Sequence, residues 1–426
     1  MAENTFIIGS DPGDDYSTIT SAFTVLTAST SYSSASQAIL RVKGPNSGGP
    51  ATYTDVDGLS FQNPGGWVTL IKIEAFDPSD PPIIDGTSSG QLGFNILQTY
   101  RAAAPDSWTN KIENVIFQNW SLGGSAGKGL FYGGGGAFQF VSCEFKDCSG
   151  GPIMNYFTAD VSAHPDASQV QRVSKVEKCT FDNCPFGIMV NEGDNPDLVQ
   201  IINNVFIHDD VSANGEYFTT AAGFGAVGGN VYNNSVVISL AGTHDAVVAY
   251  SASNNALYIT GTYGNIDGIV AYEYSNNLIY IPGGTDGSYF TTTSPGSGDG
   301  GGNLSGSDPL YTNTQNDLTP QESSPLINAG TTIASVTDDI LGESRPQGSS
   351  YDIGAYELVL FVWDTADGTP TYERKFGSGF EIHGTANRLA TRTFESGSLN
   401  RQAPYFVTIP GPANLRRRPT PYKNET

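Results

Sequence analysis

The chain lacks the segments that carry a protein into or across a membrane. Its start, "MAENTFIIGSDPGDD", has no basic stretch followed by an apolar stretch, so no secretory signal is predicted. No apolar run approaches the roughly 20 residues of a membrane-spanning helix. We therefore expect a protein without a membrane partner, kept in the cytosol where it is made or exported by a route that needs no signal.

Charged residues and familiar catalytic motifs are also scarce. Only 15% of the 426 residues are charged, whereas there are 51 glycines and many Asn, Ser and Thr, a composition typical of turn-rich β-structure. The chain has no GxSxG motif and no HExxH motif, and the glycines at 133–136 are followed by no helix pattern. These absences exclude the commonest serine-hydrolase, zinc-protease and phosphate-binding signatures, and we expect no cofactor.

Positive charge is nearly missing from most of the chain. Residues 358–426 hold 9 Lys/Arg and 6 Asp/Glu, a net charge of +3, which leaves 11 and 37 for residues 1–357, a net charge of −26. A body this acidic does not wrap nucleic acid, whose phosphates require a basic surface. It is also a poor match to a lyase that must hold the carboxylates of an acidic polysaccharide.

What the chain does have is a repeated short strand. "AVVAYSASNNALYITGT" at 246–262 is nearly repeated as "GIVAYEYSNNLIYIPGG" at 268–284, and the same template of alternating apolar residues followed by a turn recurs upstream. Repeats this short leave no room for crossover helices, so each predicts one rung of a parallel β-solenoid that stacks on its neighbours. The residues taken as equivalent are Phe117, Phe145, Phe181, Phe206, Val236, Leu257 and Ile279.

Both ends of a solenoid need a cover, and the sequence predicts one at each end. Ile19, Ala22, Phe23 and Leu26 fall at helical spacing, with Asp15 or Ser17 as the expected N-cap. After the last rungs come a Gly/Ser stretch and then longer strands across an Asp367-Gly368 turn, typical of a hairpin. The predicted organisation is an N-terminal cap (1–66), β-helix rungs (67–295), a closing segment (296–357), a C-terminal β module (358–410) and a basic extended tail (411–426).

The closing segment carries a resemblance. It contains "DPL", "SPLINAG", "RPQG" and "DIGAYE", and it resembles the closing segment of right-handed parallel β-helix repeat proteins, broadly pectate-lyase-like in fold. The resemblance covers roughly residues 5–357 and implies an all-β, right-handed parallel β-helix. It implies an activity much less, since β-helices of this kind include polysaccharide lyases and hydrolases, surface adhesins, and bacteriophage tailspikes and other virion parts.

Two sets of residues are interpreted as structural. Asn204, Asn234, Asn255 and Asn277 fall on successive rungs, where Asn suits a tight bend and its amide can bond to the Asn above and below; a polar ligand strip is the alternative. The four cysteines fall at matching positions of two rungs, with Cys143 expected near Cys179 and Cys148 near Cys184. We expect them to be buried core thiols, with disulfides as an alternative; their spacing fits no common zinc motif, and no metal site is predicted.

The candidate catalytic residues are Asp245 and Asp267, which precede the two copies of the repeat and should share one column on adjacent rungs. Two carboxylates that close suit a retaining glycosidase, or together they could hold a cation. His244 adjoins the pair, and His208, Asp209 and Asp210 lie further up the stack. The alternative is that each aspartate only caps the turn before its strand.

The tail is the candidate attachment segment. Arg416, Arg417, Arg418 and Lys423 lie in a segment with several prolines, which favour an extended arm suited to an acidic partner surface. The alternatives are contact with nucleic acid and a solvated charge run without a specific role. Together these features lead us to expect a non-enzymatic bacteriophage virion protein, assembled in the host cytoplasm: a β-helical spike, fibre or capsid-decorating protein. We expect a homotrimer that contacts other virion proteins and binds host surface polysaccharide. The alternatives are a polysaccharide-degrading tailspike-like glycosidase or lyase, and a cell-surface adhesin.

Overall fold

The structure is a computed structural model of the chain. It describes residues 2–28, 36–56, 71–87, 94–95, 110–121, 130–134, 138–149, 154–157, 174–184, 188–191, 199–208, 224–227, 229–283, 289–292, 298–363, 371–376, 379–383, 390–394 and 405–409.

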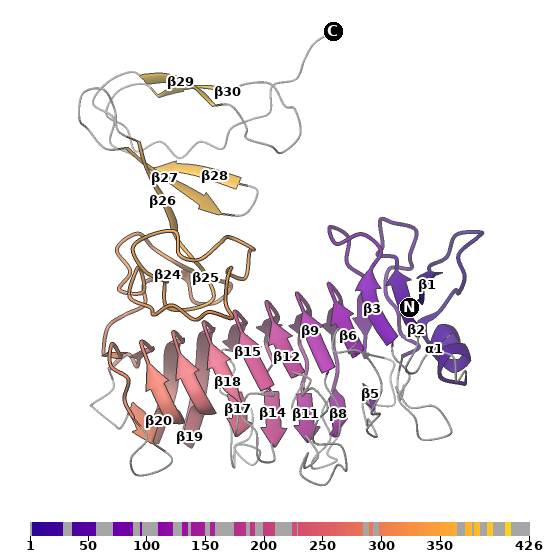
Figure 1. The fold of residues 1–426 in the computed structure, drawn as a ribbon, viewed down its shortest axis with the longest axis horizontal. Coiled ribbons are helices and arrows are strands. Elements are labelled where there is room, and N and C mark those ends of the chain that lie inside the picture. Colours follow the sequence, from indigo (N-terminus) through magenta and orange to yellow (C-terminus); the bar gives the residue numbers. More distant parts are fainter. Residues whose placement is uncertain are drawn as a thin grey trace.

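The described strands from Ala2 to Ser305 form a parallel β-helix, which confirms the predicted fold class (Figure 1). Two long columns of parallel strands run along it. The first contains β1 (Ala2–Ile8), β2 (Ser36–Val42), β3 (Ile71–Ala75), β6 (Asn110–Glu113), β9 (Phe138–Val141), β12 (Ser174–Glu177), β15 (Val199–Ile202), β18 (Asn230–Tyr232) and the ends of β19 (Ser235–Ser253) and β20 (Ala256–Ser275). The second contains β4 (Ile83–Asp85), β7 (Ile116–Gln118), β10 (Glu144–Lys146), β13 (Thr180–Asp182), β16 (Val205–His208), the starts of β19 and β20, β21 (Leu278–Tyr280) and β23 (Leu304–Ser305).

A third column completes each turn of the helix. It contains β5 (Phe94–Asn95), β8 (Phe131–Gly134), β11 (Met154–Phe157), β14 (Ile188–Asn191), β17 (Phe224–Val227), the middles of β19 and β20, and β22 (Phe290–Thr292). The chain therefore passes from the first column to the second and the third before it starts the next turn, so each sequence repeat is one rung.

The predicted equivalence of the rungs is confirmed residue by residue. Phe117, Phe145, Phe181 and Phe206 pair in register along the second column, and Val236, Leu257 and Ile279 continue the same row. The two copies of the longest repeat are also neighbours: Val248 lies opposite Val270.

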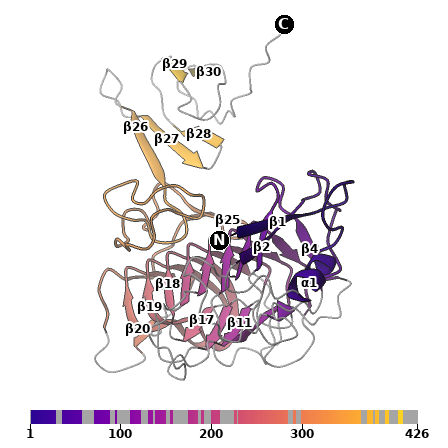
Figure 2. The same cartoon turned by 45° about the vertical axis from the view of Figure 1, so that its right-hand side comes forward.

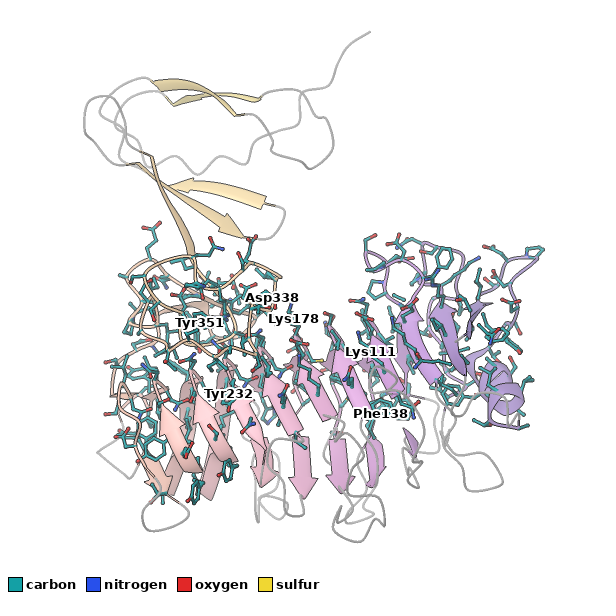
Figure 3. All side chains as sticks on the ribbon, viewed as in Figure 1. Lys111, Phe138, Lys178, Tyr232, Asp338 and Tyr351 are labelled. Atoms are coloured by element: carbon teal, nitrogen blue, oxygen red, sulfur yellow. The ribbon has the colours of Figure 1, made fainter. Side chains whose placement is uncertain are left out.

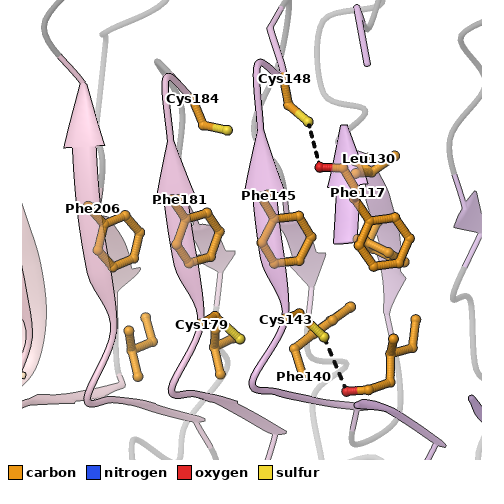
Figure 4. Close-up of a cluster of buried hydrophobic side chains, with 14 of the residues drawn as sticks. Phe117, Leu130, Phe140, Cys143, Phe145, Cys148, Cys179, Phe181, Cys184 and Phe206 are labelled. Atoms are coloured by element: carbon orange, nitrogen blue, oxygen red, sulfur yellow. Dashed lines mark hydrogen bonds between the residues drawn. The ribbon is translucent and has the colours of Figure 1, made fainter. Parts of the chain in front are cut away.

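The row of phenylalanines forms a stack at the centre of the core (Figure 4). Successive ring centroids are 5.4, 4.8 and 4.3 Å apart, with ring planes within 14° of parallel. All four rings are at most 4% exposed. Because adjacent parallel strands are held about 4.8 Å apart, identical side chains in register stack face to face, and a one-residue slip would turn the whole row outward.

The corners between columns share one form. The first residue of a corner has a positive φ of 51–58°, and the second residue is buried. Asn, Asp and Gly reach this backbone conformation most easily, so the corners are rich in Asn. Between the first and second columns the pairs are Asn114/Val115, Ser142/Cys143, Lys178/Cys179, Asn203/Asn204, Asn233/Asn234, Asn254/Asn255 and Asn276/Asn277; after the second column they are Asn119/Trp120, Asp147/Cys148 and Asn183/Cys184.

The predicted N-terminal helix is present as α1 (Ile19–Ala28), at the end of the β-helix where the chain begins (Figure 1). Its four predicted apolar residues are all buried in the core. The expected N-cap was wrong, because the cap is Thr18, whose Oγ1 accepts the backbone N–H of Ser21 at 3.1 Å. Asp15 instead accepts the backbone N–H of Ile7 on the edge strand β1, at 2.8 Å.

Residues 308–358, which we call the strap, lie along the flank of the later turns rather than across their end (Figures 1 and 2). The strap holds one antiparallel pair, β24 (Tyr311–Asn313) and β25 (Asp317–Pro320). Beyond it the predicted antiparallel module is present: β26 (Val359–Trp363), β27 (Thr371–Phe376) and β28 (Gly379–His383) form one sheet, and β29 (Ala390–Phe394) pairs with β30 (Tyr405–Ile409). The Asp367-Gly368 turn lies outside the described residues.

Replacing one ring of the phenylalanine stack should destabilise the whole β-helix. We expect Phe181→Ala to lower the free energy of unfolding by about 3–5 kcal/mol, because it removes buried apolar surface and leaves a cavity between two rings. Phe181→Leu, which keeps most of the volume, should cost much less. Urea unfolding followed by circular dichroism measures both; equal effects of the two variants would contradict a tightly packed stack.

Candidate functional site

The candidate catalytic aspartates are brought together by the backbone. Asp245 of β19 is the register partner of Asp267 in β20, so their Cα atoms lie on adjacent parallel strands, about 4.8 Å apart. Their side chains, and that of His244, lie outside the described part of the structure, as do Asp209 and Asp210. His208 is described, and it is buried in β16. A catalytic role for the aspartate pair stays a prediction.

The asparagines at the second, inner position of the corners form a continuous hydrogen-bonded column. Asn204, Asn234, Asn255 and Asn277 are each 0% exposed. The Nδ2 of each donates to the Oδ1 of the next, at 2.9–3.2 Å, and the column ends on Asn303. Each Nδ2 also donates to a carbonyl of the preceding turn: Val176, Ile201, Val231 and Ala252 in order.

The same side chains also bind the backbone of the corner before them. The Oδ1 of Asn255, for example, accepts the backbone N–H of Asn234 at 3.1 Å as well as its side-chain N–H. Each asparagine thus satisfies buried backbone groups on both neighbouring turns, which would otherwise be left without partners at a cost of about 1–3 kcal/mol each. The arrangement uses every polar atom of the amide for cohesion, so it leaves none for a ligand.

The asparagines at the first, outer position of the later corners between the first and second columns have a different task, which the sequence did not reveal. Their side chains bind the backbone of the strap: Asn203 donates to the carbonyl of Asp338 at 2.7 Å, and Asn276 to that of Ala329 at 2.9 Å. Asn254 does both, donating to the carbonyl of Thr331 and accepting its N–H at 2.7 and 2.8 Å. The only signal in the sequence is that the asparagines come in pairs.

Apolar packing completes the contact between strap and β-helix. The outward residues of the second column are apolar where the strap covers them, and they pack against the strap's Leu326, Ile353 and Ala355. The covered residues are Val205, Ile207, Val237, Ala256 and Leu278. On the two turns just before the strap, Glu144 and Thr180 take the place of Val205, whereas Ile116 and Ile83 occupy this position on the two turns before those. The strap is therefore an integral part of the fold.

A buried charge cluster lies where the strap meets the corner of Asn203. Arg345 is fully buried; it donates to Glu357 at 2.9 Å, to the carbonyl of Gly354 at 2.7 Å and to Asn203 at 3.4 Å. Asp352 and Asp339 are each 1% exposed beside it. Burial, followed by the charge of Glu357, raises the pKa of Asp352 to about 7, and burial also raises the pKa of Asp339.

Every described cation of residues 1–357 takes part in an internal ion pair. On the first column the motif Lys-x-Glu recurs in β3, β6 and β12, where Lys111 contacts Glu113 at 2.9 Å and Lys175 contacts Glu177 at 2.8 Å. Lys72 bridges Glu74 to Glu113 on the next turn. The recurring "KIE", "KIE" and "KVE" is a signal in the sequence that could have predicted this row. The paired cations are Arg41, Lys43, Lys72, Lys111, Lys146, Lys175, Lys178 and Arg345.

The four cysteines are free and buried at the second position of their corners (Figure 4). The thiol of Cys143 points to the carbonyl of Ile112 at 3.5 Å, and that of Cys148 to the carbonyl of Phe117 at 3.8 Å. Burial raises the pKa of Cys179 and Cys184 well above its usual value. Both thiols are therefore unreactive and act as apolar packing groups.

Four further findings concern metal sites, membrane spans, the predicted attachment residues and similar proteins. No group of three or more His, Cys, Asp or Glu within the described ranges is arranged to hold a metal ion. No described helix is long and apolar enough to cross a membrane. The attachment candidates Arg416, Arg417, Arg418 and Lys423 lie outside the described residues. The sequence matches no known family model and none of the curated proteins compared with it.

The two corner positions should respond differently to mutation. We expect Asn255→Ala to lower the free energy of unfolding by about 2–4 kcal/mol, because it strips partners from buried groups on two turns. Asn114→Gly should change it by less than about 0.5 kcal/mol, since glycine adopts the positive φ of 55° without strain. Thermal or urea unfolding of the two variants checks this, and a large loss with Asn114→Gly would refute the division of roles.

Proposed function

We propose that the protein is a non-enzymatic structural component of a bacteriophage particle: a β-helical spike, fibre or capsid-decorating protein. The main support for this proposal is the set of contacts that join successive turns of the β-helix. The aromatic stack, the asparagine column and the strap tie successive turns into one continuous body, in which the polar atoms of the inner asparagine side chains are engaged in cohesion. A body of this kind is suited to bear load and hold a fixed shape.

The distribution of charge supports attachment through the C-terminal region. Since the described cations of residues 1–357 are all paired internally, the body presents an excess of carboxylates. Residues 358–426, by contrast, carry a net positive charge that suits an acidic partner surface, above all at Arg416–Arg418. The strap fixes the start of this region to the body, because the backbone N–H of Leu358 donates to Asp352 at 2.6 Å.

In this proposal the protein assembles as a homotrimer with other virion proteins in the host cytoplasm, and its polar flanks contact host surface polysaccharide. The right-handed, pectate-lyase-like relationship implied by the closing segment belongs to the same proposal. Such folds serve both binding and catalysis, so the two functions are distinguished by the candidate site residues and not by the fold.

Neutralising the basic tail should detach the protein from particles. We expect Arg416→Gln, Arg417→Gln and Arg418→Gln together to reduce the amount that sediments with purified particles at least tenfold, while folding is unchanged. Binding of the wild type should weaken as salt rises, because the contact is ionic. Lys146→Gln, which removes a half-exposed cation of the body, is the control and should bind normally. Undiminished incorporation of the triple variant would defeat the anchor role.

A second function is favoured by one observation, the register of Asp245 with Asp267. Carboxylates on adjacent rungs come near the 5–5.5 Å separation of a retaining glycosidase, in which one attacks the sugar and the other protonates the leaving oxygen. The protein would then cleave the host polysaccharide that it contacts.

The substitution Asp267→Asn distinguishes cleavage from binding alone. If the pair is catalytic, the rate of polysaccharide cleavage by this variant should fall by a factor on the order of 1,000 or more, because it loses its nucleophile or its acid. Its fold should stay intact. Asp147→Asn, which changes an exposed corner carboxylate, should retain full activity. Reducing-end release from capsular or lipopolysaccharide preparations is the measurement; activity that survives in Asp267→Asn would remove the assignment.

A further inference from the structure

The contact between strap and β-helix contains more buried negative charge than positive charge. Asp339, Asp352 and Glu357 are 1%, 1% and 4% exposed, and the one buried cation among them is Arg345. Arg345 forms its ion pair with Glu357, so the two aspartates have no cation of their own. If all three carboxylates were ionised, the cluster would bury two uncompensated charges, which is unfavourable unless one group binds a proton.

Asp352 is placed so that its protonation affects the docking of the strap. Its Oδ1 accepts the backbone N–H of Asn328 at 2.7 Å, and its Oδ2 accepts that of Leu358, the residue just before β26. Its own carbonyl accepts a hydrogen bond from Arg345 at 3.1 Å and one from Asn233 of the β-helix at 3.3 Å. The residue therefore joins the strap, the corner asparagines and the start of β26.

We propose that the strap is a pH-sensitive clasp, in which a proton on the Asp352 carboxyl holds it against the β-helix and loss of that proton loosens it. In acid the cluster has one fewer buried charge and the strap is docked firmly. At neutral pH the strap opens more often, which frees the start of the C-terminal module and uncovers the apolar row of the second column. The proposal does not depend on the function proposed above.

Among the described residues, the charged groups that act on Asp352 most directly are Glu357 and Arg345, and the other titratable groups around this contact lie on the strap or at one corner of the β-helix. The β-helix contributes Lys178, which is paired with Asp338 at 2.6 Å on the edge of the strap (Figure 3); Asn203 and Asn233 do not titrate. Tyr351 lies under Arg345, 6.0 Å from its guanidinium. Burial raises the pKa of Tyr356 above its usual value, so this residue stays neutral over the pH range considered. The remaining groups on the strap are Asp317, Asp339, Glu343, Arg345 and Glu357.

The direction of the effect follows from the two states of Asp352. Its pKa is about 7 when the strap is docked and near 3.8 when it is exposed to water. Because the pKa of this carboxyl is higher in the docked state, its proton stabilises that state fully at pH values below the pKa of the exposed carboxyl. The stabilisation is lost progressively as the pH rises to the pKa of the docked carboxyl. The opening constant of the strap should therefore rise by up to tenfold per pH unit, or about 50-fold from pH 5 to pH 7, and change little above pH 8.

Hydrogen exchange of the full chain tests the clasp. The probes are the backbone N–H groups that link strap to β-helix: Gly354 to the carbonyl of Asn254 at 2.7 Å, Ala355 to Ser235 at 2.9 Å, and Thr331 to Asn254. Each rate, divided by the intrinsic rate at that pH, gives an opening constant, which should rise about 50-fold from pH 5 to pH 7. The N–H of Asn255 within the β-helix is the internal reference and should show no such rise.

Variants separate the clasp from general destabilisation. Asp352→Asn, which is always neutral, should remove most of the pH dependence and leave only the part that Asp339 contributes. Glu357→Gln keeps Asp352 but removes its negative neighbour, so the rise of the opening constant should move to lower pH. This variant tests the proposal even if the strap of Asp352→Asn does not dock at all. Lys178→Gln should raise opening equally at every pH. Opening constants that stay within threefold from pH 5 to pH 8.5 in the wild type, or an unchanged rise in Glu357→Gln, would overturn the proposal.

Discussion

The structure depends on one local constraint, the two-residue corner between the first and second columns. The outer residue takes a positive φ, and this turns the chain sharply enough that the next residue points into the body. Where that inner residue is asparagine, its amide crosses to the next turn and fixes the distance and register between turns. Register in turn aligns the phenylalanines, whose stacking fills the core.

The chain uses different inner residues along its length, and the change has a physical reason. The early corners place Val115, Cys143 and Cys179 at the inner position, next to the phenylalanine stack, where an apolar group packs well. Beyond the rung of Asn204 and Phe206, the stack gives way to the smaller Val236 and Leu257. Over the same turns the asparagine column replaces the aromatic stack as the continuous contact between rungs, and the outer asparagines bind the strap.

Sequence reasoning predicted the features that depend on contacts at the repeat spacing. Rung equivalence, the buried face of α1 and the stacking of the two asparagine-rich copies all follow from periodicity, because each is set by neighbours along the chain or one turn away. The position of the strap could not be predicted, since Val205 and Val237 look like ordinary outward residues of a strand until their distant partner is known. The N-cap was missed because Asp15, Ser17 and Thr18 are all good capping residues. Asp15 binds the backbone of β1 instead, a contact that the local sequence does not reveal, and Thr18 caps the helix.

The central claim, that inner asparagines hold successive turns together, is tested most directly by the exchange of their own side-chain amides. Asparagine-selective ¹⁵N labelling would allow the Nδ2 hydrogens of Asn204, Asn234, Asn255 and Asn277 to be followed after transfer to heavy water. Our account predicts that these amides exchange only when the β-helix unfolds, many orders of magnitude more slowly than the exposed Asn119. Exchange of the inner amides at the rate of Asn119 would contradict it.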